Sequence, residues 1–147
     1  MATKVNLYTD GACSGNPGRG GWCAILTVGE HEKVLLGGEE KTTNNRMELL
    51  AVISGLEALI RPCDITVVSD SKYVCDAFNK GWLDSWQKNN WRKSNKKPVL
   101  NKELWERLLL QTTVHEVKFE WVEGHAGHPE NERCDKIASA IAQGKSI

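Results

Sequence analysis

Hydrophobic and polar residues alternate along the first forty positions in a way that is typical of β-strands. The alternation over residues 5–10 predicts one strand, and residues 22–28 and 34–39 predict two more. Between the first two strands lies GACSGNPGRGG, residues 11–21, whose glycines and proline indicate a turn-rich break. We therefore expect the chain to open with three antiparallel strands.

The pattern then changes to one that is typical of a buried helix. Residues 42–60 would be apolar around most of a helical circumference, and Arg61-Pro62 would end that helix. A nearly continuous apolar run over residues 65–70 predicts a strand that is covered on both faces. Residues 72–79 follow it as a predicted helix, because the serines and aspartate just before them are good helix caps.

The second half of the chain alternates between helical and extended patterns. The expected elements are a short helix after residue 80, an irregular stretch at 95–100, a helix at 101–112, a strand at 116–122 and a helix from Pro129. The resulting order β-β-β-α-β-α-α-β-α predicts a mixed sheet with helices on its faces. We expect one α/β domain over residues 1–147, without internal repeats.

Length and composition agree with one soluble globular domain of 147 residues, 40% of them hydrophobic and 26% charged. No apolar run approaches the ~18 residues that a membrane span needs, and the first residues lack a signal-peptide pattern. Five widely spaced cysteines without a C-x-x-C pair favour reduced thiols. The expected protein is cytoplasmic and monomeric, with neither membrane association nor an obligate protein partner.

The formal net charge is zero, yet the basic residues are concentrated in one segment. Residues 80–102 contain seven lysines and arginines against a single acid, Asp84, and Trp82, Trp86 and Trp91 are interleaved with them. A solvated helix face with tryptophans turned into the core would explain the pattern. Alternating basic and aromatic residues are also the composition that grips phosphates and stacks on sugars or bases. The composition alone leaves both explanations open.

Four acids stand at positions where carboxylates are unusual: Asp10, Glu48, Asp70 and Asp135. Each has an ordinary explanation, such as a turn, a helix cap, a solvated face or, for Glu48, a capping box with Asn45. If the first and fourth strands are neighbours, however, Asp10 and Asp70 emerge from adjacent strand ends, where open α/β sheets bind ligands. Converging carboxylates repel one another unless a cation neutralises them, and Mg²⁺ suits such a site.

Four blocks of the sequence together resemble the bacterial type 1 ribonuclease H family: YTDGACSGNPGRGGW, TTNNRMELLAVISGLEAL, SDSKYV and WVEGHAGHPENERCDKIA. The resemblance covers essentially the whole chain. It implies the ribonuclease H-like fold, with a five-stranded mixed sheet whose first three strands are antiparallel. It also implies a divalent-metal-dependent endonuclease that hydrolyses the RNA strand of RNA–DNA hybrids and leaves 5′-phosphate and 3′-hydroxyl ends.

The same resemblance assigns roles to particular residues. It places catalytic, metal-binding carboxylates at Asp10, Glu48, Asp70 and Asp135, with two Mg²⁺ ions bound alongside substrate and Mn²⁺ as a substitute. Asp10 would bridge the two ions. His125, in the GHAGHPENE loop, would assist proton transfer or product release.

Further motif positions are implied to contact the nucleic acid. The resemblance places Cys13, Gly15, Asn16, Asn44 and Asn45 near the RNA strand, Thr43 and Asn101 in a pocket for a DNA phosphate, and Trp82 and Trp86 in a DNA-facing channel. One departure is Lys72, where many relatives carry an uncharged amide. Another is the neutral net charge, since several bacterial members are basic. Both departures bear on affinity and its salt dependence.

Two other functions are compatible with parts of this sequence. A non-catalytic hybrid-binding module would keep the fold and the basic segment, but it gains nothing from clustered acids beside a phosphate. Another nuclease of the same superfamily, such as a resolvase or a 3′-exonuclease, would keep the acids, but the basic, Trp-rich segment favours the hybrid-cleaving enzyme.

Overall fold

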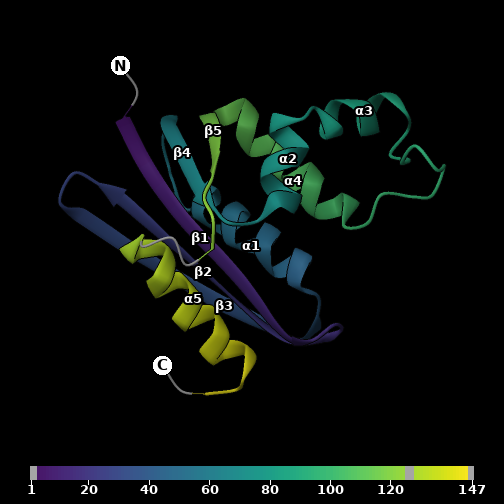
Figure 1. The fold of residues 1–147 in the computed structure, drawn as a ribbon. Helices are drawn as coiled ribbons and strands as arrows, with labels where there is room; N and C mark the ends of the chain where they lie inside the picture. Colours follow the sequence, from purple (N-terminus) through teal and green to yellow (C-terminus); the bar gives the residue numbers. More distant parts are fainter. Residues whose placement is uncertain (1–2, 125–127, 146–147) are drawn as a thin grey trace.

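The computed structural model describes residues 3–124 and 128–145 and is built around one five-stranded sheet (Figure 1). Its strands are β1 (Thr3–Gly15), β2 (Gly18–Val28), β3 (His31–Thr42), β4 (Cys63–Ser69) and β5 (Glu116–Trp121). They lie in the order β3-β2-β1-β4-β5. The first three strands pair antiparallel, while β4 pairs parallel with both β1 and β5. The predicted mixed sheet is confirmed.

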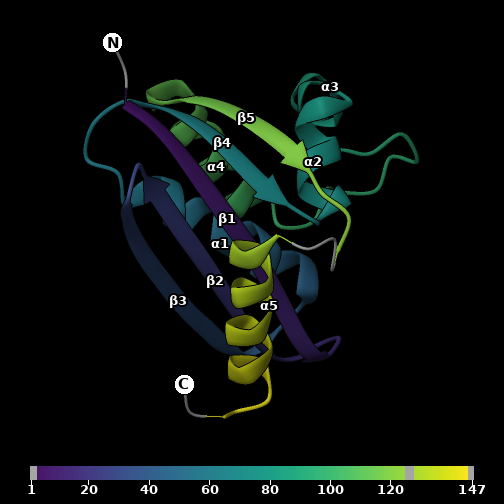
Figure 2. The same cartoon turned by 60° about the vertical axis from the view of Figure 1, so that its left-hand side comes forward.

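Helices cover both faces of the sheet. They are α1 (Asn44–Glu57), α2 (Lys72–Asn79), α3 (Trp82–Lys88), α4 (Lys102–Val114) and α5 (Pro129–Ala142). Figure 2 shows α5 across β1 and β2 on one face, with α1 and α4 behind the sheet on the other. The three helices expected between β4 and β5, at 72–79, after residue 80 and at 101–112, are all present, although the expected order β-β-β-α-β-α-α-β-α counted only two of them. Lys80 is the C-cap of α2 and Gly81, with φ +74°, is the N-cap of α3, so the two helices are separate.

The predicted break at residues 11–21 is wrong, because both strands of the first hairpin continue through most of it. Strand β1 runs to Gly15 and β2 starts at Gly18. A Cβ added at Gly11 would lie 2.6 Å from the Met47 carbonyl carbon, and one at Gly21 would lie 2.6 Å from the Ala138 carbonyl oxygen. These two glycines therefore allow α1 and α5 to approach the sheet closely. As a result Asp10 lies within β1 and not at its end.

The main core lies between the sheet and helices α1 and α4. Fully buried side chains such as Leu7, Ile53, Val67 and Trp105 fill it. A smaller cluster of Cys23, Ile25 and Cys134 packs α5 on the opposite face. Within residues 3–124 and 128–145, no helix is both long and apolar enough to cross a membrane.

Candidate active site

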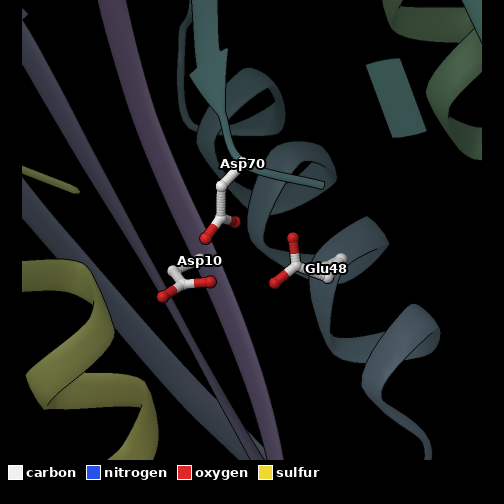
Figure 3. Close-up of side chains that lie close together, drawn as sticks. All are labelled: Asp10, Glu48 and Asp70. Carbon is white, nitrogen blue, oxygen red and sulfur yellow. The ribbon is translucent and has the colours of Figure 1, made fainter. Parts of the chain in front are cut away.

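Three of the four predicted carboxylates converge (Figure 3). Asp10, Glu48 and Asp70 each offer an oxygen, and these oxygens lie within 4.8 Å of one another. They come from β1, from α1 and from the residue that follows β4. The parallel pairing of β1 with β4 extends to Tyr8 opposite Val68, and both aspartates lie just beyond that pair. The strand adjacency expected from the sequence therefore brings Asp10 and Asp70 together.

Glu48 joins the cluster because Gly11 lets α1 approach β1. The Gly11 N–H donates to Glu48 Oε1 at 2.5 Å and also lies 2.9 Å from Asp10 Oδ1, so one donor serves both carboxylates. The capping-box explanation of Glu48 is wrong. Thr43 is the N-cap of α1, and its Oγ1 accepts from the Arg46 N–H at 3.2 Å.

Burial and mutual repulsion disfavour the charged forms of these acids. Asp10 is 8% exposed and Glu48 is 4% exposed. Burial raises the pKa of Asp10 to about 7, and the carboxylates of Asp70 and Asp135 contribute to the rise. Burial also raises the pKa of Glu48 well above its ordinary value, with the Asp10 charge as the next cause.

The donor set fits a hard divalent cation. Glu48 Oε2 is buried and, within the described part of the chain, has no hydrogen-bond partner. A buried carboxylate oxygen without a partner is costly unless a cation or water occupies the space beside it. All-oxygen donors that carry negative charge match Mg²⁺ and Mn²⁺ in their ligand preferences.

The fourth predicted carboxylate, Asp135, lines the same groove as Asp10, Glu48 and Asp70. It is carried by α5, whose first turns are held to the sheet by Asn131. The Asn131 side-chain amide donates to the Val68 carbonyl at 3.1 Å. Residues four apart share one face of a helix, so this anchor directs Asp135 toward the edge of the sheet where the other acids lie. His125 lies outside the described residues.

Asn44 and Asn45, which were expected near the RNA strand, line the groove beside the acids. Ser71, Lys72, Tyr73 and Trp121 also line it, and none of these four had been predicted as a site residue. The Trp121 indole N–H donates to the Asp70 carbonyl at 3.0 Å. Trp121 could be placed here only from the register of β5 with β4, in which it pairs with Ser69. That register follows from tertiary packing and leaves no local signal in the sequence.

Four of the other predicted substrate-binding residues lie on the first hairpin and at the start of α4. Cys13, Gly15 and Asn16 lie on the β1–β2 hairpin, where the half-buried Cys13 thiol is 3.3 Å from the Thr42 carbonyl. Asn101 precedes α4 with φ +60°, and its side-chain amide donates to the Tyr73 hydroxyl at 3.3 Å. These contacts connect the start of α4 to α2 beside the groove.

The tryptophans of the basic segment, residues 80–102, include one that is exposed and others that pack against the core. Trp82 is 39% exposed. Trp86 is partly buried, and its ring centroid lies 5.5 Å from that of the core residue Trp105. Lys102 Nζ lies 5.8 Å from the ring centroid of Trp91. Packing against the core therefore explains the position of Trp86, whereas the lysines and Trp82 are exposed to solvent.

Comparisons with known proteins agree with this geometry. The RNase H family model matches residues 2–143. A ribonuclease H from Oleidesulfovibrio alaskensis is 58% identical over 95% of this chain and 90% of its own length. A ribonuclease H from Thermus thermophilus is 54% identical over 97% of this chain and 86% of its own.

A solved type 1 RNase H with the type 2 active-site motif superposes with a TM-score of 0.87 at 28% identity, covering 99% of this chain and 75% of that one. The fold thus defines an α/β protein of the ribonuclease H class, and its acidic groove is compatible with metal binding. The chain belongs to the ribonuclease H family, as the sequence motifs predicted.

Proposed function

We propose that this chain is an endonuclease that hydrolyses the RNA strand of RNA–DNA hybrids with the aid of bound Mg²⁺. The convergence of Asp10, Glu48 and Asp70 within 4.8 Å in an open groove carries the proposal. Its support from relatives is the 58% identity to a ribonuclease H over 95% of the chain. The whole sequence, residues 1–147, acts as one domain in this proposal, as a cytoplasmic monomer.

In this proposal Asp10, Glu48, Asp70 and Asp135 hold the metal. Bound metal supplies an activated water and neutralises the phosphate that is attacked. Burial raises the pKa of both Asp10 and Glu48, and a bound cation would oppose that rise because it favours the charged carboxylates. His125 assists proton transfer or product release.

The remaining motif residues bind the two strands. The set consists of Cys13, Gly15, Asn16, Asn44 and Asn45 for the RNA strand, and Thr43, Asn101, Trp82 and Trp86 for the DNA strand. Asn44 and Asn45 line the groove beside the acids, and in this proposal they contact the RNA strand there. A 2′-hydroxyl at that nucleotide is what distinguishes RNA from DNA.

The test uses an RNA–DNA hybrid labelled at the 5′ end of its RNA strand, incubated with the chain in Mg²⁺ or in EDTA. We expect internal cleavage in Mg²⁺, with 5′-phosphate and 3′-hydroxyl product ends, and none in EDTA. Cleavage that proceeds equally in EDTA would rule out the role of the carboxylates. Binding of the hybrid without any cleavage in Mg²⁺ would favour the non-catalytic binding module.

A further inference from the structure

We propose that Lys72 binds a backbone phosphate of the nucleic acid in the acidic groove, and that Trp121 positions its ammonium for that contact. The proposal rests on the proposed function, since it assigns one more contact to the same substrate. It concerns a charge that the family's motif does not require at this position.

The geometry places Lys72 at the rim of the groove. Its Nζ lies 5.0 Å from the centroid of the Trp121 ring, and both residues line the groove with Asp10 and Asp70. A cation within about 6 Å of an indole face is attracted by the ring's quadrupole. The attraction narrows the range of positions that the long side chain samples, so less entropy is lost when it binds a ligand.

Trp121 is itself held in place at two points. Its backbone ends β5 opposite Ser69 of β4, and its indole N–H donates to the Asp70 carbonyl at 3.0 Å. The ring that supports Lys72 is therefore fixed relative to the backbone of a proposed metal ligand. Lys72 therefore lines the same groove as the carboxylates that a phosphate would approach.

The ammonium is available to an anion. Lys72 is exposed and takes part in none of the ion pairs between described side chains, whereas Lys80 at the end of the same helix pairs with Asp76 at 3.5 Å. Contact with a ring face leaves the positive charge intact and its N–H groups free to donate. A groove floored by acids repels phosphate, so a fixed cation at its rim favours entry of the strand.

The first test measures how salt affects binding of an RNA–DNA hybrid, in an Asp10→Asn background that leaves the hybrid uncut. Lys72→Gln should reduce the slope of log K against log salt by about 0.9, the value for one lost phosphate contact. The ratio of dissociation constants should then be about eightfold at 0.1 M salt and approach one near 1 M. Lys33→Gln, on the exposed start of β3, removes the same charge away from the groove and should leave the slope unchanged.

The second test separates the two residues in chains with an intact Asp10. Lys72→Gln and Trp121→Leu should both raise KM with little change in kcat, and the double variant should show less than the product of the two effects. Trp121→Phe keeps a ring face for the ammonium but loses the N–H that holds the ring, so it should raise KM less than Trp121→Leu does. Lys72→Arg keeps the charge and should restore KM.

An unchanged salt slope in Lys72→Gln would overturn the proposal. If Lys72→Gln leaves the salt slope constant but changes the Mg²⁺ concentration for half-maximal cleavage, the proposal is also overturned. Lys72 would then act only on the charge of the acids. A slope that depends on Lys72 in a chain that never cuts the hybrid would refute the proposed function and leave the Lys72 contact standing. A chain that does not bind the hybrid at all would overturn both.

Discussion

Asp10 and Glu48 are buried carboxylates that lie close together, so their negative charges repel each other in the metal-free chain. The pKa of Asp10 rises from its ordinary 3.8 to about 7, mainly through burial. The folded chain therefore binds this proton more tightly than the unfolded chain does. As pH rises through the window between about 4 and 7, the folded state loses stability relative to the unfolded state.

Asp10→Asn should remove that penalty. In EDTA at pH 8 we expect a higher Tm than in the unsubstituted chain, because an amide needs no ionisation in a buried site. Each kcal/mol gained corresponds to about 2–4 °C in a chain of this size. The gain should shrink as pH falls below about 7 and vanish below about 4, and thermal unfolding across that range measures it.

Two controls define the outcome. Asp84→Asn, at an exposed position in the first turn of α3, should show no such dependence on pH. Mg²⁺ should narrow the difference between the chains, since the cation stabilises the form that keeps Asp10. An Asp10→Asn chain that is less stable at pH 8 in EDTA would contradict the account of the acidic cluster.

At the scale of elements, the contact between β1 and α1 assembles the site. A Cβ at Gly11 would meet the Glu48 amide nitrogen at 2.5 Å, and backbone cannot move aside as a side chain can. Gly11→Ala should therefore push α1 away from β1 and separate Glu48 from Asp10. We expect a lower Tm and a several-fold higher Mg²⁺ concentration for half-maximal cleavage.

Gly55→Ala provides a matched control in α1. Its Cβ would meet the Leu7 side chain at 2.5 Å, in the core and away from the carboxylates. This variant should also lower the Tm by disturbing packing. Its Mg²⁺ requirement should stay close to that of the unsubstituted chain. If both variants shift the Mg²⁺ requirement equally, the close approach at Gly11 has no specific role in the site.

Local signals predicted some elements closely and missed others for physical reasons. The predicted helix over 72–79 has the observed bounds, because Ser71 caps it by accepting from the Val74 N–H at 3.3 Å. The first hairpin was predicted too short, because glycines that admit a packed helix have the same local signature as glycines in a turn. The acids could be predicted from motifs, whereas Trp121 could be assigned only from strand register.

The whole molecule separates its charges although its net charge is zero. Acids floor the groove at the edge of the sheet, while α3 and the chain after it project to one side (Figure 1). Lys93, Lys96 and Lys97 lie exposed in that projecting chain. If an RNA–DNA hybrid reaches from the groove to this segment, the protein would contact its phosphates at both places.

Replacing Lys93, Lys96 and Lys97 together by Gln should weaken hybrid binding. The salt slope should fall by up to about 0.9 for each phosphate contact that is lost, and KM should rise. The test is to measure the binding constant of the triple variant for the hybrid as a function of salt concentration. A slope equal to that of the unsubstituted chain would mean that the three lysines only solvate the segment.

We propose that this chain cuts RNA only when the RNA is paired with DNA. The most direct measurement offers it, in Mg²⁺, a hybrid labelled on both strands beside single-stranded RNA, an RNA duplex and a DNA duplex. We predict cleavage of the RNA strand of the hybrid alone, and an Asp10→Asn chain that binds the hybrid without cutting it. Cutting of the DNA strand or of the other substrates at a similar rate, or full activity in Asp10→Asn, would contradict the account.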